Sequence, residues 1–292
     1  MPKVENLEFE ILSDNVVDRN GLIGLPGFSV LVSAYLTNGE LVQIVFDTTS
    51  NPEELKKNID YLDVDLSQVQ HVILSHGHWD HVAGLGLISE LITKKVPLIC
   101  HPHALLPKLR SKNGKEQDIG IREYFTIGEI EEMYSVMTTR KPFKITDSIL
   151  TTGEIPLETT YEKKVGRLKD IMTVIDEKRV RDEILDDLSL IFIMSDETLV
   201  ILTGCCHAGL VNTINQAMRI TGISVVKFVI GGFHLSGASE ERLQKTCEKL
   251  RAVRISGVAP AHCTGIKGKC KLLSEFKKEY KEVRVGTKFS IS

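Results

Sequence analysis

Apolar positions in the first fifty residues form two strand-like runs separated by a turn signal. The runs cover residues 28–36 and 41–48 and flank Asn38 and Gly39. Asn-Gly is the strongest short signal for a two-residue hairpin turn, because both central positions of such a turn need a positive φ. This pattern predicts a β-hairpin whose second strand ends at Asp47.

Helical and strand-like patterns alternate along the next part of the chain. Amphipathic spacing at 51–62, with Pro52 in the first turn, predicts a helix, and a second helix is expected at 83–95. Continuous apolar runs at 70–76 and 96–105 predict buried strands. The first third of the chain is therefore expected to be rich in strands, with helices between them.

Residues 104–145 lose this apolar continuity. They contain a polar loop and a helical segment at 128–137, a composition more typical of a mobile flap than of a core. We therefore expect a flap or lid insertion at about 104–145, which could cover a functional site.

The second half of the chain again places strands before helices. Strands are expected at 189–195, 199–204 and 225–232, and helices at 208–220 and 238–252. No low-complexity linker separates the two halves of the sequence. We interpret residues 1–292 as one α+β domain in which two sheets lie between two layers of helices, an αββα sandwich.

Charge and cysteine usage narrow the class of protein. A net charge of −3 supplies no basic field for nucleic acid, so we expect small-molecule partners and no nucleic acid. The first residues lack the apolar core of a signal peptide, and no apolar stretch is long enough to span a bilayer. Six cysteines without a C-x-x-C pair fit reduced thiols, so a cytoplasmic location without membrane contact is expected. Assembly into a homo-oligomer stays open.

The densest chemistry follows a predicted strand directly. His76, His78, Asp80 and His81 fall within six residues. A loop leaving a strand can project alternate side chains the same way, so the first two histidines can reach one cation while Asp80 and His81 turn toward a second. Gly77 allows the backbone to bend closely there. Imidazole with carboxylate suits zinc, manganese or iron, and a merely solvated polar loop is the weaker interpretation.

The stretch "SHGHWDH" resembles the signature of the metallo-β-lactamase superfamily. That resemblance implies an αββα sandwich with one or two divalent metal ions at one edge, zinc first, with manganese, iron or magnesium as alternatives. Asp47 falls where the family places an aspartate that supports the metal loop. Most members carry an aspartate that bridges the two metals where this chain has Cys205, which is a departure from the family pattern.

Three later motifs narrow the resemblance to one branch of the superfamily. "LTGCCHAGLVNTI", "GGFHL" and "APAHCTG" resemble the branch that includes the archaeal dihydropterin-ribofuranosylaminobenzene phosphate synthases of methanopterin biosynthesis and many bacterial metal-dependent hydrolases. The resemblance implies an enzyme for a phosphorylated small molecule such as a pterin. Hydrolysis and transfer both stay open, because both use metals on an anionic leaving group.

The same resemblance suggests the remaining ligands. His207, in a strand-to-helix loop, is expected to be the third imidazole of the first metal. His262 follows a short strand, where the superfamily places its last ligand, and is expected on the second metal with Asp80 and His81. Asp187 opens a predicted strand and is a weaker candidate: a ligand, a support for one, or a solvated turn acid.

Two residues are candidates for catalysis itself. Asp80 would orient the attacking group as well as bind metal, and His234 would contact substrate or act as general acid. Gly231 and Gly232 precede His234 and permit close approach to the backbone, although packing at a tight turn is the alternative for this histidine. A metal- or ligand-binding sensor without catalysis is the alternative at the level of the whole protein.

Overall fold

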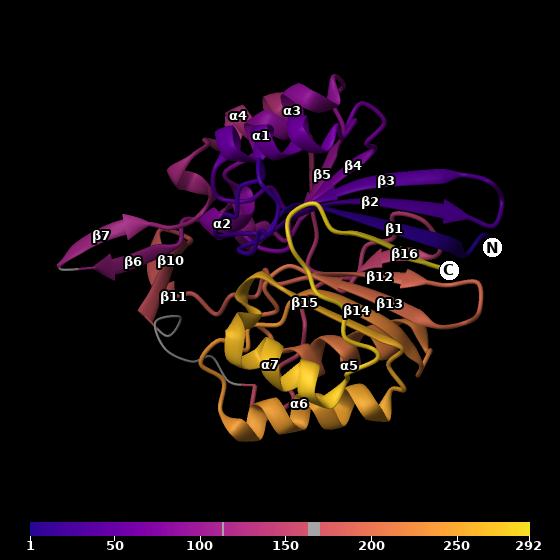
Figure 1. The fold of residues 1–292 in the computed structure, drawn as a ribbon. Helices are drawn as coiled ribbons and strands as arrows, with labels where there is room; N and C mark the ends of the chain where they lie inside the picture. The colour runs from indigo at the N-terminus through magenta and orange to yellow at the C-terminus, as the bar shows by residue number, and fades with distance from the viewer. Residues whose placement is uncertain (113, 163–169) are drawn as a thin grey trace.

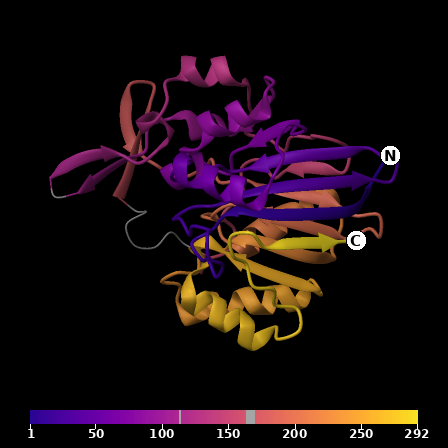
Figure 2. The ribbon, with the colours of Figure 1, turned by 45° about the horizontal axis from the view of Figure 1, so that its top comes forward.

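Two β-sheets face each other and carry helices on their outer faces (Figure 1, Figure 2). The computed structural model describes residues 1–112, 114–162 and 170–292. Residue 113 of the expected flap therefore lies outside the described residues. The layers run helix, sheet, sheet, helix, which confirms the αββα sandwich expected from the sequence.

The first sheet has seven strands, and three helices cover it. The strand order is β16 (Lys288–Ile291), β1 (Val4–Ser13), β2 (Ser29–Leu36), β3 (Leu41–Phe46), β4 (His71–Ile73), β5 (Pro97–Cys100) and β8 (Ser135–Thr138). The covering helices are α1 (Pro52–Leu62), α3 (Leu85–Ile92) and α4 (Ile127–Met133). Strands β3, β4, β5 and β8 pair in parallel, so their carboxyl ends lie at one edge.

The second sheet repeats this plan with five strands. The order is β15 (Gly257–Ala261), β14 (Val226–Gly232), β13 (Leu199–Thr203), β12 (Ser189–Ile193) and β9 (Ile149–Thr151), and the covering helices are α5 (Leu210–Thr221), α6 (Glu240–Ala252) and α7 (Gly265–Glu275). Strands β13, β14 and β15 are parallel. Apolar side chains from both sheets fill the space between them, with Phe9 and Phe192 in edge-to-face contact across the interface.

The hairpin of β2 and β3 is present, but its turn differs from the expected one. The N–H of Gly39 donates to the carbonyl of Leu36 (2.8 Å), and Gly39 has a φ of +85°. Asn38 stays outside the left-handed region. The loop is therefore a type I turn followed by a left-handed glycine, and the expectation of two positive-φ positions was wrong.

A third, four-stranded sheet projects from one end of the sandwich (Figure 1, Figure 2). We call it the projecting sheet; its order is β11 (Lys178–Arg181), β10 (Ile171–Ile175), β6 (Leu109–Lys112) and β7 (Lys115–Asp118). Of the flap expected at 104–145, only β6 and β7 belong to the projecting sheet. Much of the remainder packs on the sandwich: α4 ends at Met133, and the buried Tyr134 donates its hydroxyl to the carbonyl of Leu85 (2.7 Å).

Short helical turns complete the described part of the chain. They are α2 (Trp79–Val82) and the 3₁₀ turns at Pro102–Leu105, Ile121–Glu123 and His262–Thr264. Among the described residues, none of the helices combines the length and apolarity required to cross a membrane.

Candidate metal centre

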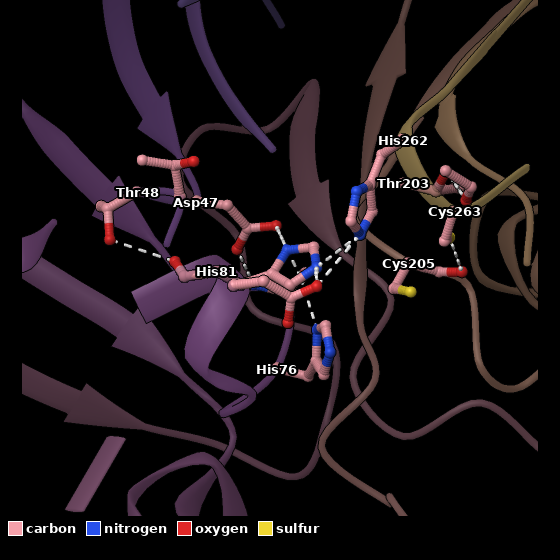
Figure 3. A network of polar contacts seen from close by, with 12 residues as sticks. Asp47, Thr48, His76, His81, Thr203, Cys205, His262 and Cys263 are labelled. Atoms are coloured by element: carbon pink, nitrogen blue, oxygen red, sulfur yellow. Dashed lines mark hydrogen bonds and ion pairs between the residues drawn. The ribbon is translucent and has the colours of Figure 1, made fainter. Parts of the chain in front are cut away.

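The candidate metal centre lies where the carboxyl ends of parallel strands from both sheets meet. Asp47 follows β3 and His76 follows β4 in the first sheet, while Cys205 follows β13 and His262 follows β15 in the second. Figure 3 shows these side chains converging from the two sheets. Parallel sheets commonly place ligand sites at this edge, because their loops bring distant residues together there.

Three histidines form what we call the first ligand group: His76, His78 and His207. Their ligand atoms all lie within 4.8 Å of one another. The Nε2 atoms of His76 and His207 are 3.1 Å apart. Two imidazole nitrogens on one tetrahedral zinc are about 3.3 Å apart, given zinc–nitrogen distances of about 2.0–2.1 Å. The spacing therefore fits a shared cation.

Asp80, His81 and His262 form the second ligand group, again with all ligand atoms within 4.8 Å. The Nε2 atoms of the two histidines are 3.2 Å apart, and Oδ2 of Asp80 lies 3.4 Å from Nε2 of His262 and 3.9 Å from Nε2 of His81. Burial alone would raise the pKa of Asp80, but the neighbouring His81 and His262 outweigh it and lower that pKa below its usual range. A carboxylate and two imidazoles are a donor set that zinc, iron and manganese accept.

Asp47 orients one histidine in each ligand group. Its Oδ2 accepts from Nδ1 of His81 (2.7 Å) and from the hydroxyl of Ser75 (2.7 Å). Because the Ser75 hydroxyl donates to Asp47, it accepts from Nδ1 of His76, which lies 2.9 Å away. The Nε2 atoms of His76 and His81 are therefore the unprotonated nitrogens, free to bind a cation.

His262 is held in the same way by the amino-terminal part of the chain. Its Nδ1 lies 2.6 Å from Oδ1 of Asn15, which accepts the ring proton, and its backbone N–H donates to Oδ2 of Asp14 (2.7 Å). Asn15 and Ser75 contact the candidate ligands but were not expected from the sequence. Ser75 lies inside the recognisable motif, whereas Asn15 is 247 residues from its partner and carried no signal.

The protonation of the first ligand group also suits a cation. Burial, aided by the other histidines, lowers the pKa of His76 well below the usual value, and burial with Lys108 lowers the pKa of His78 to about 4. The pKa of His207 is also lowered well below its usual value, chiefly by burial and by the neighbouring His234. Nε2 of His78 is buried without a hydrogen-bond partner in the described part of the chain. Neutral imidazoles, one of them with an orphaned nitrogen, fit a divalent metal.

His262 behaves differently from those three histidines. Burial lowers its pKa, but Cys263 and Asp80 outweigh burial and raise that pKa to about 9. A cation in the second ligand group would therefore have to displace a proton that the first ligand group does not carry.

Cys205 lies between the two ligand groups. Its Sγ shares a possible cluster with His76 and His81, and another with His234 and Cys263. The Sγ atom is 3.4 Å from Nδ1 of His234. Cys206 instead places its Sγ 3.3 Å from Oγ1 of Thr213 in α5, so it packs inside the second half of the sandwich.

Asp187 is not brought to the ligand atoms. Within the described residues it belongs to none of the four candidate clusters, and its Oδ2 accepts from the backbone N–H of Ala208 (2.8 Å). Burial raises the pKa of Asp187 to about 7, although N–H groups of Ala208 and His207 oppose the shift. This geometry fits a residue that supports the loop carrying His207. It does not fit the direct metal ligation that was the other expectation for Asp187.

The glycines before His234 make room for neighbouring backbone. A Cβ on Gly231 would lie 1.9 Å from the carbonyl oxygen of Thr203, and one on Gly232 would lie 2.4 Å from that of Gly204. His234 itself has a φ of +46° and lines a cavity of about 330 Å³ with residues of both ligand groups. His234 is therefore accessible from the cavity that both ligand groups line.

Comparisons with known proteins agree with this geometry. The chain matches the family described as "Metallo-beta-lactamase superfamily" over residues 24–177. It is 30% identical to the 7,8-dihydropterin-6-methyl-4-(beta-D-ribofuranosyl)-aminobenzene-5'-phosphate synthase of Methanocaldococcus jannaschii, over 97% of this chain and 96% of that one. A second protein of the same organism, described as uncharacterized, is 31% identical over 90% of this chain and 93% of its own.

Solved structures give the same picture. A metal-dependent hydrolase of the β-lactamase superfamily superposes with a TM-score of 0.79 at 25% identity, over 98% of this chain and 99% of that one. A diphosphatase from the PhnP family shares the fold at 11% identity, with a TM-score of 0.52 over 99% and 98% of the chains. By sequence and by fold, this chain belongs to the metallo-β-lactamase superfamily.

Proposed function

We propose that this protein is a metal-dependent enzyme for a phosphorylated small molecule, with an activity resembling that of its 7,8-dihydropterin-6-methyl-4-(beta-D-ribofuranosyl)-aminobenzene-5'-phosphate synthase relative. The observation that carries the proposal is the opening of both ligand groups into one cavity. A pterin is the substrate that the relative suggests.

Each side chain has a proposed role. The two ligand groups would hold one or two divalent ions, zinc first, with manganese, iron or magnesium as alternatives. Such ions would activate water or neutralise charge developing on phosphoryl oxygens. Asp80 is held ionised beside His81 and His262, and would orient the attacking group. His234 lines the same cavity and would donate a hydrogen bond or a proton to the leaving group.

Whether transfer or hydrolysis occurs depends on water access to the cavity. We propose that the projecting sheet limits that access, because Arg110 and Ile119 from the expected flap, together with Ile171 of β10, line the cavity. The second candidate is a metal-dependent phosphodiesterase-type hydrolase. It is favoured by the structural match to a metal-dependent hydrolase at 25% identity.

The first experiment tests the metal. Elemental analysis of the purified protein should find divalent metal that is lost in His76→Ala and His78→Ala. His71→Ala is the matched control, because this histidine lies outside the candidate clusters of the described residues. Equal metal content in all four proteins would refute the proposal.

The second experiment separates the reactions. Metal-loaded protein would be incubated with a hydroxymethyl-dihydropterin diphosphate, with and without an arylamine acceptor, and with a panel of chromogenic phosphodiesters. Coupling of the pterin that requires the acceptor supports transfer. Turnover of simple diesters alone supports the hydrolase. Metal content without either activity would leave the sensor as the explanation.

A further inference from the structure

An arginine whose side chain has no partner among the described residues lines the same cavity as the two ligand groups. Arg110 lies on β6 of the projecting sheet, and its Nε is buried without a hydrogen-bond partner. No ion pair joins its guanidinium to any residue in the described ranges. The two arginines of β11 differ, because Arg179 pairs with Glu116 and Arg181 with Glu183.

A guanidinium in this position is a strong anion-binding group. Arginine stays protonated at every physiological pH, and its planar fork matches phosphate and carboxylate oxygens with two parallel hydrogen bonds. Burial of the Nε of Arg110 without a partner costs free energy, which a bound anion would recover. The carboxylate of Asp80 lines the cavity as well, but it is already shared with His81 and His262.

The backbone that carries Arg110 is anchored to the metal loop. Arg110 pairs with Gln117 of β7 and Ile171 of β10. Two residues earlier, the ammonium of buried Lys108 lies 2.9 Å from a carboxylate oxygen of Asp186, whose other oxygen accepts the N–H of Gly77 (2.8 Å). The guanidinium is thus on an element tied to the metal loop rather than on a free arm.

Apolar side chains occupy the rest of the cavity wall. Pro26, Trp79, Ile119 and Ile171 line it together with the polar groups already described. A cavity with cation-binding ligands, one unpaired guanidinium and an apolar wall suits a ligand with two separate anionic groups on an apolar body.

We infer that Arg110 binds the non-reacting anionic group of a substrate whose reacting phosphoryl group is held at the ligand groups. The placement of the reacting phosphoryl group at the ligand groups rests on the proposed function. The inferred site assigns the substrate to a class: small molecules with two anionic groups separated by an apolar body. Arg110 then determines specificity without touching the reacting atoms.

The test compares probes with one and two anionic groups. Metal-loaded protein would be titrated with alkane bisphosphonates of increasing chain length and with alkane monophosphonates of the same lengths. Trp79 is the only tryptophan of the chain and lines the cavity, so its fluorescence reports binding, and calorimetry checks each titration. At one range of lengths the second phosphonate should tighten binding about tenfold or more, as expected for a hydrogen-bonded ionic group.

Two variants decide the role of Arg110. Arg110→Gln should lose the gain from the second phosphonate and keep the wild-type affinity for the monophosphonate. Arg179→Gln changes an arginine of β11 in the same sheet that is paired with Glu116, and it should behave as wild type. The inference is overturned if no chain length shows a gain, or if Arg110→Gln keeps it.

The proposed function has its own readout in the same titrations. Monophosphonate binding should weaken strongly after EDTA treatment, because the metal would hold that group. If EDTA changes nothing while Arg110→Gln removes the gain, the metal function fails and the Arg110 site stands. If no phosphonate binds at all, both are refuted.

Discussion

At the scale of single residues, Asp47 orients one histidine in each ligand group. Its Oδ1 accepts the backbone N–H of Ser75 (2.7 Å), and its Oδ2 serves His81 directly and His76 through the Ser75 hydroxyl. Asp47 takes a φ of +59°, which is unusual for a residue with a Cβ, and it is fully buried. Residues that orient metal ligands are as important for affinity as many of the ligands themselves.

We therefore expect Asp47→Asn to weaken zinc binding about 10–100-fold. The amide carries no charge to strengthen His81 as a ligand, and its NH₂ group cannot accept the hydrogen bonds that Asp47 receives. Titration against a chelator of known affinity measures the loss. Asp63→Asn is the control, since Asp63 also has a positive φ (+53°) but is exposed at the end of α1. Equal zinc affinity in the two variants would contradict this role.

The sequence predicted the site residues unevenly, and the reason is their spacing. The residues from His76 to His81 form a contiguous motif, so their meeting could be expected before any fold was known. Asn15 and His262 meet only because β1 of the first sheet and β15 of the second sheet end at the same edge. Asp187 was ambiguous because a buried acid next to a loop can bind a metal or backbone N–H groups equally well; here it accepts from Ala208.

At the scale of elements, one buried lysine joins the projecting sheet to the sandwich. Lys108 precedes β6, and its ammonium lies 2.9 Å from carboxylate oxygens of both Asp182 and Asp186. Burial lowers the pKa of Lys108, but the two carboxylates outweigh it and raise that pKa, so the ammonium stays charged. The free energy of this cluster depends on all three charges being present.

Lys108→Met should lower the free energy of unfolding by about 3–5 kcal/mol, because two buried carboxylates then lose their common counter-charge. Urea unfolding measures the change. Adding Asp186→Asn to this variant should restore part of the loss, whereas the exposed Lys94→Met should be neutral. A loss below about 1 kcal/mol would show that the cluster contributes as little as a surface ion pair.

Gly231, near the end of β14, offers a second test of an element. Alanine there needs a φ of +121° and would place its Cβ 1.9 Å from the carbonyl oxygen of Thr203. We expect Gly231→Ala to lower the melting temperature far more than Gly237→Ala, where φ is +76° and nothing lies within 4 Å of the Cβ. Both sites have a positive φ, so the larger loss at Gly231 reflects crowding between β13 and β14 together with a φ farther from the left-handed region. Equal melting temperatures would exclude that explanation.

Elements with strong local patterns were predictable, and elements defined by distant partners were not. The amphipathic helix at 51–62 corresponds to α1, and the apolar run at 225–232 to β14. The projecting sheet was missed, because its strands are short, largely polar, and paired between β6 and β10 across some sixty residues. The geometry of the turn at Gly39 was predicted wrongly because Asn-Gly occurs in more than one type of hairpin turn.

At the scale of the whole molecule, both ligand groups cross the boundary between the two halves of the sandwich. His207 from the second half completes the group that contains His76 and His78, and His262 completes the group that contains Asp80 and His81. Figure 3 shows the crossing for His81, which comes from the first half, and His262, which comes from the second. A bound cation would therefore cross-link the two sheets, a consequence of topology that no local pattern in the sequence contains.

The last prediction follows from this cross-link. A ligand that binds only the folded state at one hundred times its dissociation constant stabilises that state by about 2.7 kcal/mol. Zinc added to EDTA-treated protein at one hundred times its dissociation constant should therefore raise the free energy of unfolding by about that amount. His207→Ala and His262→Ala should each reduce this gain. Cys270→Ser is the control, because this exposed thiol lies outside both ligand groups. If both histidine variants kept the full zinc-dependent gain, the metal would be bound elsewhere, and no cation would link the two halves of the sandwich at this edge.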